Sequence, residues 1–272
     1  MAAKLGNALL KKRGKANLLN VIPEELDNTQ GTKEERLHQL WDKWYGCTRC
    51  HLSTTRDPGN DPNDIVFGEG SCEAKILVVG EGPGEEEEDG GVPFLGDSGR
   101  LLNNLMAQGT DDPETKQVLA DYHKVTGMQA DRKFHEYMIE WRKRDFFLIN
   151  TVACRPPENR VPNATELKEC WNRVWNVINI LDPLLIVACG NTALAVLTKK
   201  NTAHITKQRG NIHDIEIPGR VAPIIYPVFP VFHPAYLLRK ADFKIKGGDW
   251  EKSVEDWKNI TKTVRFLEKH GV

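Results

Sequence analysis

Four cysteines in this sequence are spaced in a way that suits one metal centre. Cys47 and Cys50 form a Cys-x-x-Cys pair, and Cys154 and Cys170 follow with fifteen residues between them. Thiolates are soft ligands, and both zinc and iron–sulfur clusters accept four of them. A Cys-x-x-Cys pair can also be a redox couple, but nothing thioredoxin-like surrounds this one. The spacing therefore predicts a metal site and leaves the choice of metal open.

A second candidate site is the glycine- and glutamate-rich segment Gly80–Asp89, which continues to Pro93 and Phe94. Glycines after a strand let backbone N–H groups approach a ligand closely, and the run of acids places carboxylates beside it. The segment is neither a dinucleotide fingerprint nor a phosphate loop. A solvated acidic loop would explain most of the glutamates but not the Gly-Glu-Gly-Pro-Gly punctuation. The aromatic residue at its end is either core or a stacking platform.

Two polar residues and a basic segment add further candidates. Asn150 ends an apolar run, where an amide is costly unless it is paired, and it offers a ligand both a donor and an acceptor. His233 is either a satisfied structural histidine or a donor to a group on which negative charge develops. The residues after it place Leu237 and Leu238 beside Arg239, as expected of a loop that wedges into a duplex and holds a phosphate.

The elements that must position these residues can be predicted from hydrophobic patterning and turn chemistry. Short β-branched runs predict buried strands at 75–79, 146–150, 184–188 and 224–232. Pro227 and Pro230 make the last of them an edge or irregular strand. Helices are predicted at 32–45, from Ser98 through Leu105, within 109–145, at 165–181, from Gly190 and at 250–269, and loops at 80–89 and 233–239. Thr32 and Glu35 form a capping box for the first helix.

Strands that alternate with helices predict a three-layer α/β/α sandwich with a mainly parallel central sheet. Ligands bind at the carboxyl ends of such strands. The turns after Gly80, Asn150, Gly190 and Phe232 are therefore expected to converge on one edge of the sheet.

The bulk composition is that of an ordinary globular protein with a formal net charge of −1 at pH 7. Affinity for nucleic acid must then come from local basic patches rather than from overall charge. No apolar run approaches the length of a membrane span, and six cysteines in a chain of this length do not make a disulfide framework. We expect a basic, flexible extension at 1–30, one domain at 31–272 with an enlarged helical insertion at 109–145, and a cytoplasmic, nucleoid-associated location.

The ordered motifs resemble those of the family 4 uracil-DNA glycosylases, the bacterial and archaeal iron–sulfur type. They are Gly80-Glu-Gly-Pro-Gly-Glu with Pro93-Phe94, Asn150-Thr-Val-Ala-Cys154-Arg-Pro-Pro, Ile205-Thr-Lys-Gln-Arg-Gly210 and His233-Pro-Ala-Tyr-Leu-Leu-Arg239. The order and spacing of the four cysteines fit as well, and the match covers roughly residues 36–268. Each motif alone is weak evidence, but in this order they are highly specific.

The resemblance implies a role for each candidate residue. A structural 4Fe–4S cluster, rather than zinc, would be bound by Cys47, Cys50, Cys154 and Cys170, and would order the loop 155–160 near DNA. Phe94 would stack on a flipped uracil, Asn150 would read its edge and His233 would contact its O2. Uracil presents O4 beside N3–H, and cytosine presents the opposite pattern, so one asparagine can discriminate between them. The pocket would be lined by Glu81, Gly82 and Pro83.

The implied reaction is monofunctional hydrolysis of the N-glycosidic bond of a flipped-out deoxyuridine, which leaves an abasic site. None of the residues that the resemblance places around the base is a lysine that could form a Schiff base. His233 would stabilise the departing uracil anion, and a carboxylate would position water or face the cationic sugar. Glu81 and Glu87 are both candidates for that carboxylate, and the sequence does not decide between them. The expected DNA contacts are Arg155, Arg160, Lys207, Arg209, Leu237, Leu238 and Arg239.

Two features depart from the family pattern. The 109–145 segment is longer than the family's short connection by about one helical hairpin, and the basic tail is extra; either could bind a replication or repair partner. One rival hypothesis is a catalytically silent or altered-specificity homologue that acts as a DNA- or replisome-binding module. Another is a glycosylase for mispaired bases or deaminated purines. The joint presence of Phe94, Asn150 and His233 favours a monomeric enzyme that excises uracil from single- or double-stranded DNA.

Overall fold

A six-stranded sheet forms the centre of the computed structural model, which describes residues 29–56, 64–123, 132–199, 204–219, 223–240 and 245–271. The strand order is β1-β3-β2-β4-β6-β5. The strands are β1 (Glu69–Gly70), β2 (Ile76–Gly80), β3 (Phe146–Asn150), β4 (Leu185–Cys189), β5 (His213–Ile217) and β6 (Ile224–Val231). The central four run parallel, and β1 and β5 are antiparallel at the two edges. The predicted, mainly parallel α/β/α sandwich is confirmed.

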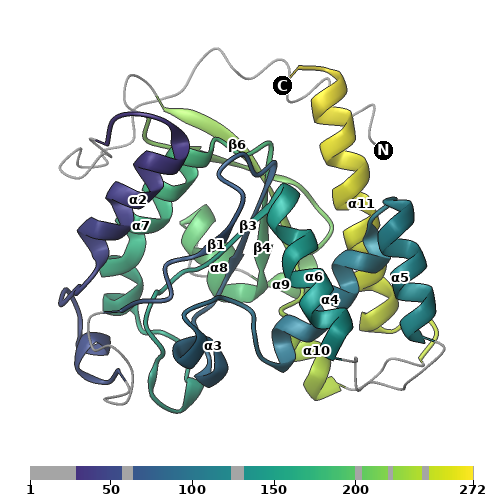
Figure 1. Ribbon diagram of the computed structural model, residues 1–272, viewed down its shortest axis with the longest axis horizontal. Helices are drawn as coiled ribbons and strands as arrows, with labels where there is room; N and C mark the ends of the chain where they lie inside the picture. Colours follow the sequence, from purple (N-terminus) through teal and green to yellow (C-terminus); the bar gives the residue numbers. More distant parts are fainter. Residues whose placement is uncertain are drawn as a thin grey trace.

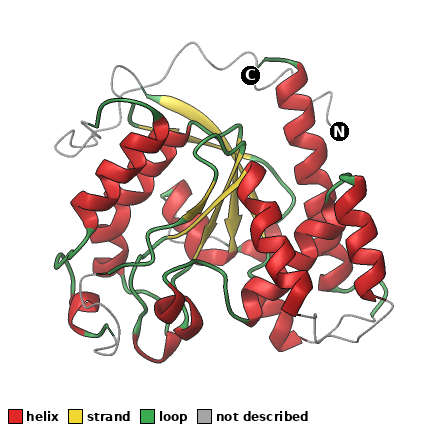
Figure 2. Cartoon of the chain, viewed as in Figure 1, coloured by secondary structure: helices red, strands yellow, loops and turns green. Residues whose placement is uncertain are grey.

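Helices cover both faces of this sheet (Figures 1 and 2). They are α2 (Lys33–Trp44), α3 (Glu85–Gly90), α4 (Asp97–Gly109), α5 (Pro113–His123), α6 (Arg132–Asp145), α7 (Ala164–Leu181), α8 (Gly190–Thr198), α9 (Ile205–Gln208), α10 (Pro234–Lys240) and α11 (Asp249–Lys269), with short 3₁₀ turns at His51–Thr54 and Pro157–Asn159. The predicted capping box of α2 is present, because the Thr32 hydroxyl accepts from Glu35 N and the Glu35 carboxylate accepts from Thr32 N. None of the helices that the structure describes is long and apolar enough to cross a membrane.

The three strands β2, β3 and β4 are buried along their whole length. Parallel strands are covered on both faces, which explains why their sequences are continuous apolar runs rather than alternating ones. On one side α2 and α7 pack together, and on the other α4, α6 and α11 lie near each other (Figure 1). The centre of the sheet is therefore packed on both faces, and the loops that follow the strands lie at its carboxyl edge.

Several predicted elements were wrong in type. The glutamate-rich segment after Gly84 is a short helix, α3, because acids in a first turn interact favourably with the helix dipole. The segment after His233 is also a helix, α10, with Pro234 at its first position. The N-cap of helix α4 is Gly96, two residues before the predicted cap at Ser98, and the helix begins at Asp97. The short strands β1 and β5 were not predicted.

Strand β6 is an interior strand and not the predicted edge strand. It lies between β4 and β5, with Pro230 opposite Ala188 and Pro227 opposite Asp214. Residues 224–228 of β6 pair with β5 and residues 228–231 pair with β4, so each proline lies where the strand has one paired neighbour. The predicted flexible tail falls outside the described residues except for its last two positions, and the insertion at 109–145 contains α5 and α6.

Candidate active site

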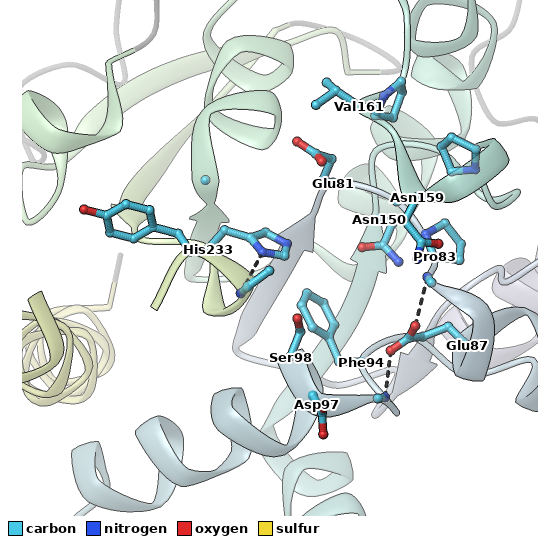
Figure 3. A pocket seen from close by; sticks show the side chains of 18 of the residues that line it. Glu81, Pro83, Glu87, Phe94, Asp97, Ser98, Asn150, Asn159, Val161 and His233 are labelled. Atoms are coloured by element: carbon cyan, nitrogen blue, oxygen red, sulfur yellow. Dashed lines mark hydrogen bonds between the residues drawn. The ribbon is translucent and has the colours of Figure 1, made fainter. Parts of the chain in front are cut away.

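The carboxyl ends of the parallel strands open into one cleft of about 840 Å³. This volume is within the range of small-molecule sites. Glu81 after β2, Asn150 at the end of β3, Gly190 after β4 and His233 after β6 all line the cleft (Figure 3). The predicted convergence of four turns on one sheet edge is therefore present.

Asn150 is 3% exposed, and the described residues give its side-chain amide no hydrogen-bond partner. Its backbone is fixed, because it pairs with Gly80 in register. A Cβ atom at Gly80 would overlap Asn150 Oδ1 and lie 2.6 Å from Phe94 Cζ. Because Gly80 has no side chain, the Asn150 amide and the Phe94 ring can both occupy the space beside it. The amide is then available to bind a ligand.

Phe94 is a buried aromatic residue with a left-handed backbone, φ 59°. Its ring lies beside His233, with ring centroids 6.5 Å apart and an interplanar angle of 31° (Figure 3). A positive φ is unfavourable for a residue other than glycine and persists only where the surroundings hold it. The residues that hold the Phe94 backbone in this conformation therefore contribute to the site.

Glu87 holds the Phe94 turn from one side. Its Oε1 accepts from Leu95 N at 2.9 Å and Gly96 N at 2.8 Å, and its Oε2 accepts from Gly84 N at 2.8 Å. Both carboxylate oxygens are thus engaged by backbone N–H groups that join two loops of the cleft (Figure 3). The sequence did not decide between Glu81 and Glu87 as the carboxylate that assists hydrolysis. In the structure Glu87 is arranged to position the loops.

Glu81 is the other carboxylate, and it lines the cleft. Its Oε2 accepts a short hydrogen bond from the Thr192 hydroxyl in the first turn of α8, and its backbone oxygen accepts from the Thr151 hydroxyl. The first bond orients the side chain and the second holds the backbone, and Oε1 is left without a protein partner among the described residues. Glu81 is therefore placed to face a bound ligand.

His233 has its imidazole oriented by the start of α10. Its Nδ1 accepts from Ala235 N at 3.2 Å, so the proton of the neutral ring is on Nε2. Burial lowers the pKa of His233, with the Arg239 charge adding to that shift and the Glu81 charge opposing it. The ring is therefore a neutral imidazole at neutral pH that can donate from Nε2 into the cleft.

The four predicted metal ligands lie together beside this cleft. Cys47, Cys50, Cys154 and Cys170 line one small cavity between the end of α2, the turn after it and α7. Burial raises the pKa of the Cys154 thiol to about 11, and the Arg56 charge opposes that shift. Among the described residues no three metal-ligating side chains are gathered tightly enough for a single ion.

Arg173 is a fully buried guanidinium that sequence reasoning missed. It donates to Phe67 O at 2.7 Å and to Asn150 O at 2.5 Å, and its Nε has no partner. Burial lowers the pKa of Arg173, and the opposing influence comes from Cys170 and Cys154 rather than from any carboxylate in the described chain. A buried cation without a counter-charge is unfavourable, and the groups beside Arg173 that can carry negative charge are these cysteines.

The basic residues predicted to contact DNA fall into two groups: some form ion pairs within the described chain and others do not. Arg155 pairs with Glu85 and Glu88 at 3.4 and 3.5 Å, Arg160 with Glu166 at 2.6 Å, and Arg209 with Asp256 at 2.7 Å. Lys207 and Arg239 are exposed and have no ion pair within the described ranges. Arg209 is largely buried and joins the end of α9 to α11, and its role as a DNA contact stays a prediction.

The predicted leucine wedge is wrong for Leu237. This side chain is fully buried on the inner face of α10, and Leu238 is partly buried against the same core. A leucine that the helix directs inward cannot enter a duplex. The most exposed large apolar side chain at the rim of the cleft is instead Val161, which is 61% exposed (Figure 3). A lone valine in a proline-rich loop carries no sequence signal that would have marked it.

The sequence is similar to a family of known proteins. A family model described as the uracil DNA glycosylase superfamily matches residues 67–258. The chain is 32% identical over 240 residues to a type-4 uracil-DNA glycosylase of Thermotoga maritima, covering 88% of this chain and 99% of that protein. It is 30% identical over 222 residues to a protein of the same name from Sulfurisphaera tokodaii, covering 80% and 83%. A third, from Pyrobaculum aerophilum, is 27% identical over 223 residues, covering 81% and 90%.

Proposed function

The chain belongs to the type-4 family of the uracil DNA glycosylase superfamily, and we propose that it excises uracil from DNA by hydrolysis. The observation that carries this proposal is the meeting of Phe94, Asn150 and His233 in one cleft. The three groups complement three features of uracil: a ring for its face, an amide for the O4 and N3–H edge, and an N–H donor for O2.

In the proposed reaction the bond between uracil N1 and the sugar C1′ breaks, and its electron pair leaves with the base. His233 Nε2–H donates to O2, where the negative charge of the leaving uracil develops. The Glu81 carboxylate faces the cationic sugar and positions the water. That water gives its hydroxyl to C1′ and its proton to the departing base or to solvent.

The test of this function is base release from oligonucleotides that carry a single uracil, hypoxanthine or thymine, in single- and double-stranded form, followed by alkaline cleavage. We expect strand breaks only at uracil. Release of hypoxanthine alone would favour the deaminated-purine rival. A folded protein that releases no base but retains DNA would favour the silent binding module.

We infer that DNA phosphates bind at Lys207 and Arg239, which are exposed and have no ion pairs in the described chain. Arg160 also lines the cleft, and it would need to share its guanidinium between Glu166 and a phosphate. Phosphate contacts position the strand without reading its sequence. The single-domain boundary at 31–272, the monomeric state and a repair partner bound through 109–145 stay predictions.

We propose that the four cysteines bind a 4Fe–4S cluster. Two features support the fit: the four thiols line one small cavity, and the charges that oppose the lowered pKa of the buried Arg173 come from those thiols. Such a cluster would brace the fold, since hydrolysis of a glycosidic bond transfers no electrons. Arg173 would neutralise part of the thiolate charge and, through Asn150 O, tie the cysteines to the cleft.

Arg173→Met is expected to lower iron content and to destabilise the protein by about 3–5 kcal/mol, because removing one partner leaves buried charge uncompensated. Iron analysis, visible absorbance and urea denaturation would measure both effects. Lys168→Met on the exposed face of α7 is the matched control. Full iron loading with unchanged stability in Arg173→Met would contradict the pairing, and a colourless wild type with stoichiometric zinc would overturn the cluster.

A second prediction concerns the pH dependence of stability. Because the folded pKa of His233 is lowered, the unfolded chain binds a proton at higher pH than the folded chain does. The free energy of unfolding should therefore fall as pH drops below about 6.5, by up to about 1.4 kcal/mol per pH unit from this group. His233→Gln should make this slope shallower between pH 7 and 5, as measured by urea denaturation at a series of pH values.

A further inference from the structure

Helix α6, the second helix of the 109–145 segment, contacts the back of the Phe94 turn through a fully buried arginine. Arg142 Nη1 donates to Phe94 O at 3.2 Å. Its Nη2 donates to Pro93 O at 3.1 Å and to Glu69 Oε2 at 2.9 Å. One cation thus holds two successive backbone carbonyls of the turn, and a carboxylate at strand β1 supplies the counter-charge.

His135, two turns earlier on α6, extends this contact. Its Nδ1 is 2.8 Å from Asn103 Nδ2, and its Nε2 is 3.1 Å from Leu95 O. If the Asn103 amide donates to Nδ1, the ring proton is on Nε2 and donates to the carbonyl. Asn103 Oδ1 in turn accepts from Arg142 at 3.2 Å. The three carbonyls of residues 93–95 are therefore all bonded by side chains of α6.

The turn needs such support because Phe94 has φ 59°. Strained backbone of this kind persists only where several contacts fix it together. Glu87 takes the N–H groups on one side of the turn, and α6 takes the carbonyls on the other. Gly99 packs against the same place, since a Cβ atom there would overlap Phe94 O.

We propose that Arg142 is a positioning residue for base recognition, which fixes the turn that presents the Phe94 ring beside Asn150. The inference rests on the proposed function, because the task of that ring is to stack on uracil. Arg142 is fully buried and does not line the cleft, so it acts through Phe94 and not on the substrate. The enlarged segment 109–145 would then support the site through buried contacts with the Phe94 turn.

Hydrogen–deuterium exchange of the peptide spanning residues 92–98 tests the support directly, without any need for activity. In Arg142→Met the amides of Leu95 and Gly96 should exchange at least about 10-fold faster, because local opening frees the turn. Arg144→Met is the matched control, since Arg144 is exposed on the same helix and lies 3.7 Å from Asp112. Unchanged exchange in folded Arg142→Met would overturn the proposal.

A double-mutant cycle tests whether the effect passes through Phe94. Arg142→Met should lower kcat/KM for uracil release about 10- to 100-fold, and Arg142→Lys should lower it less. In a Phe94→Ala background, Arg142→Met should cost less than about 3-fold more, because the ring it positions is already gone. Equal losses in both backgrounds would mean a general structural role and would sink the inference.

The two arms separate the possible failures. A wild type that releases no uracil refutes the proposed function, while the exchange of residues 92–98 still decides whether Arg142 holds the turn. An active wild type whose Arg142→Met variant keeps full activity and a normal melting temperature refutes the positioning role alone.

Discussion

Asn150→Ala is expected to lower kcat/KM for uracil release by about 10²- to 10³-fold while leaving the melting temperature nearly unchanged. The amide has no hydrogen-bond partner in the described chain, so the fold loses little when it is removed. The substrate loses the only proposed donor–acceptor pair for its O4 and N3–H edge, and those groups stay unpaired at the buried position that Asn150 occupies. Unpaired polar groups in such a site cost several kcal/mol. Single-turnover release from a uracil-containing oligonucleotide measures the effect.

Asn150→Asp sharpens this test because it preserves size and changes hydrogen-bonding capacity. An ionised carboxylate only accepts, so it can take uracil N3–H but repels O4. We expect a loss at least as large as for alanine, and no such loss for Asn104→Ala, whose amide pairs with Gln108 on α4. Wild-type rates in both Asn150 variants would show that the base is read elsewhere.

The sheet and the convergence of the loops could be predicted because they depend on local signals. Continuous apolar runs give buried parallel strands, and the residue that follows each strand is then placed by topology alone. Asn150 and His233 lie at such positions, so the sequence located them correctly. The same rule says nothing about side-chain direction, which explains the error at Leu237. That leucine is in a helix and faces inward.

Sequence reasoning could not find the groups that hold the site from behind. Arg142 and Arg173 resemble ordinary surface cations in the sequence, yet both are fully buried and bind backbone carbonyls of residues far away in the chain. Every residue has a backbone carbonyl, whatever its type, so a sequence motif cannot show which carbonyl an arginine binds. Glu87 was ambiguous for the same reason, because its three partners are backbone N–H groups.

These buried groups connect regions that the sequence treats as separate. Arg173 joins the cysteine cavity to the end of β3, and Arg142 joins the inserted helix α6 to the Phe94 turn. The proposed edge-reading residue, Asn150, and the proposed stacking residue, Phe94, each have a backbone carbonyl that accepts from a buried guanidinium. On the proposed function, the geometry of base recognition would therefore depend on two charges that do not contact the substrate.

Gly80→Ala tests how closely the amide and the ring must meet, and it is expected to lower kcat/KM for uracil release by about 10²-fold. The added methyl group would overlap Asn150 Oδ1 and stand 2.6 Å from Phe94 Cζ, so one or both must move. Displacement of a substrate-positioning group by about 1 Å can cost this much in rate. Stability should fall by only about 1–3 kcal/mol, the usual cost of one extra methylene in a packed region.

Gly82→Ala provides the comparison, because the atoms nearest to its Cβ atom would be the Val152 methyl at 3.0 Å and the Pro156 ring at 3.5 Å. Those side chains can shift without moving Asn150 or Phe94, so the expected loss is smaller than for Gly80→Ala. Urea denaturation separates stability from activity in both variants. If Gly80→Ala kept wild-type kcat/KM, the amide and the ring would not need to share that space in the reacting complex, and the proposed recognition geometry would be wrong.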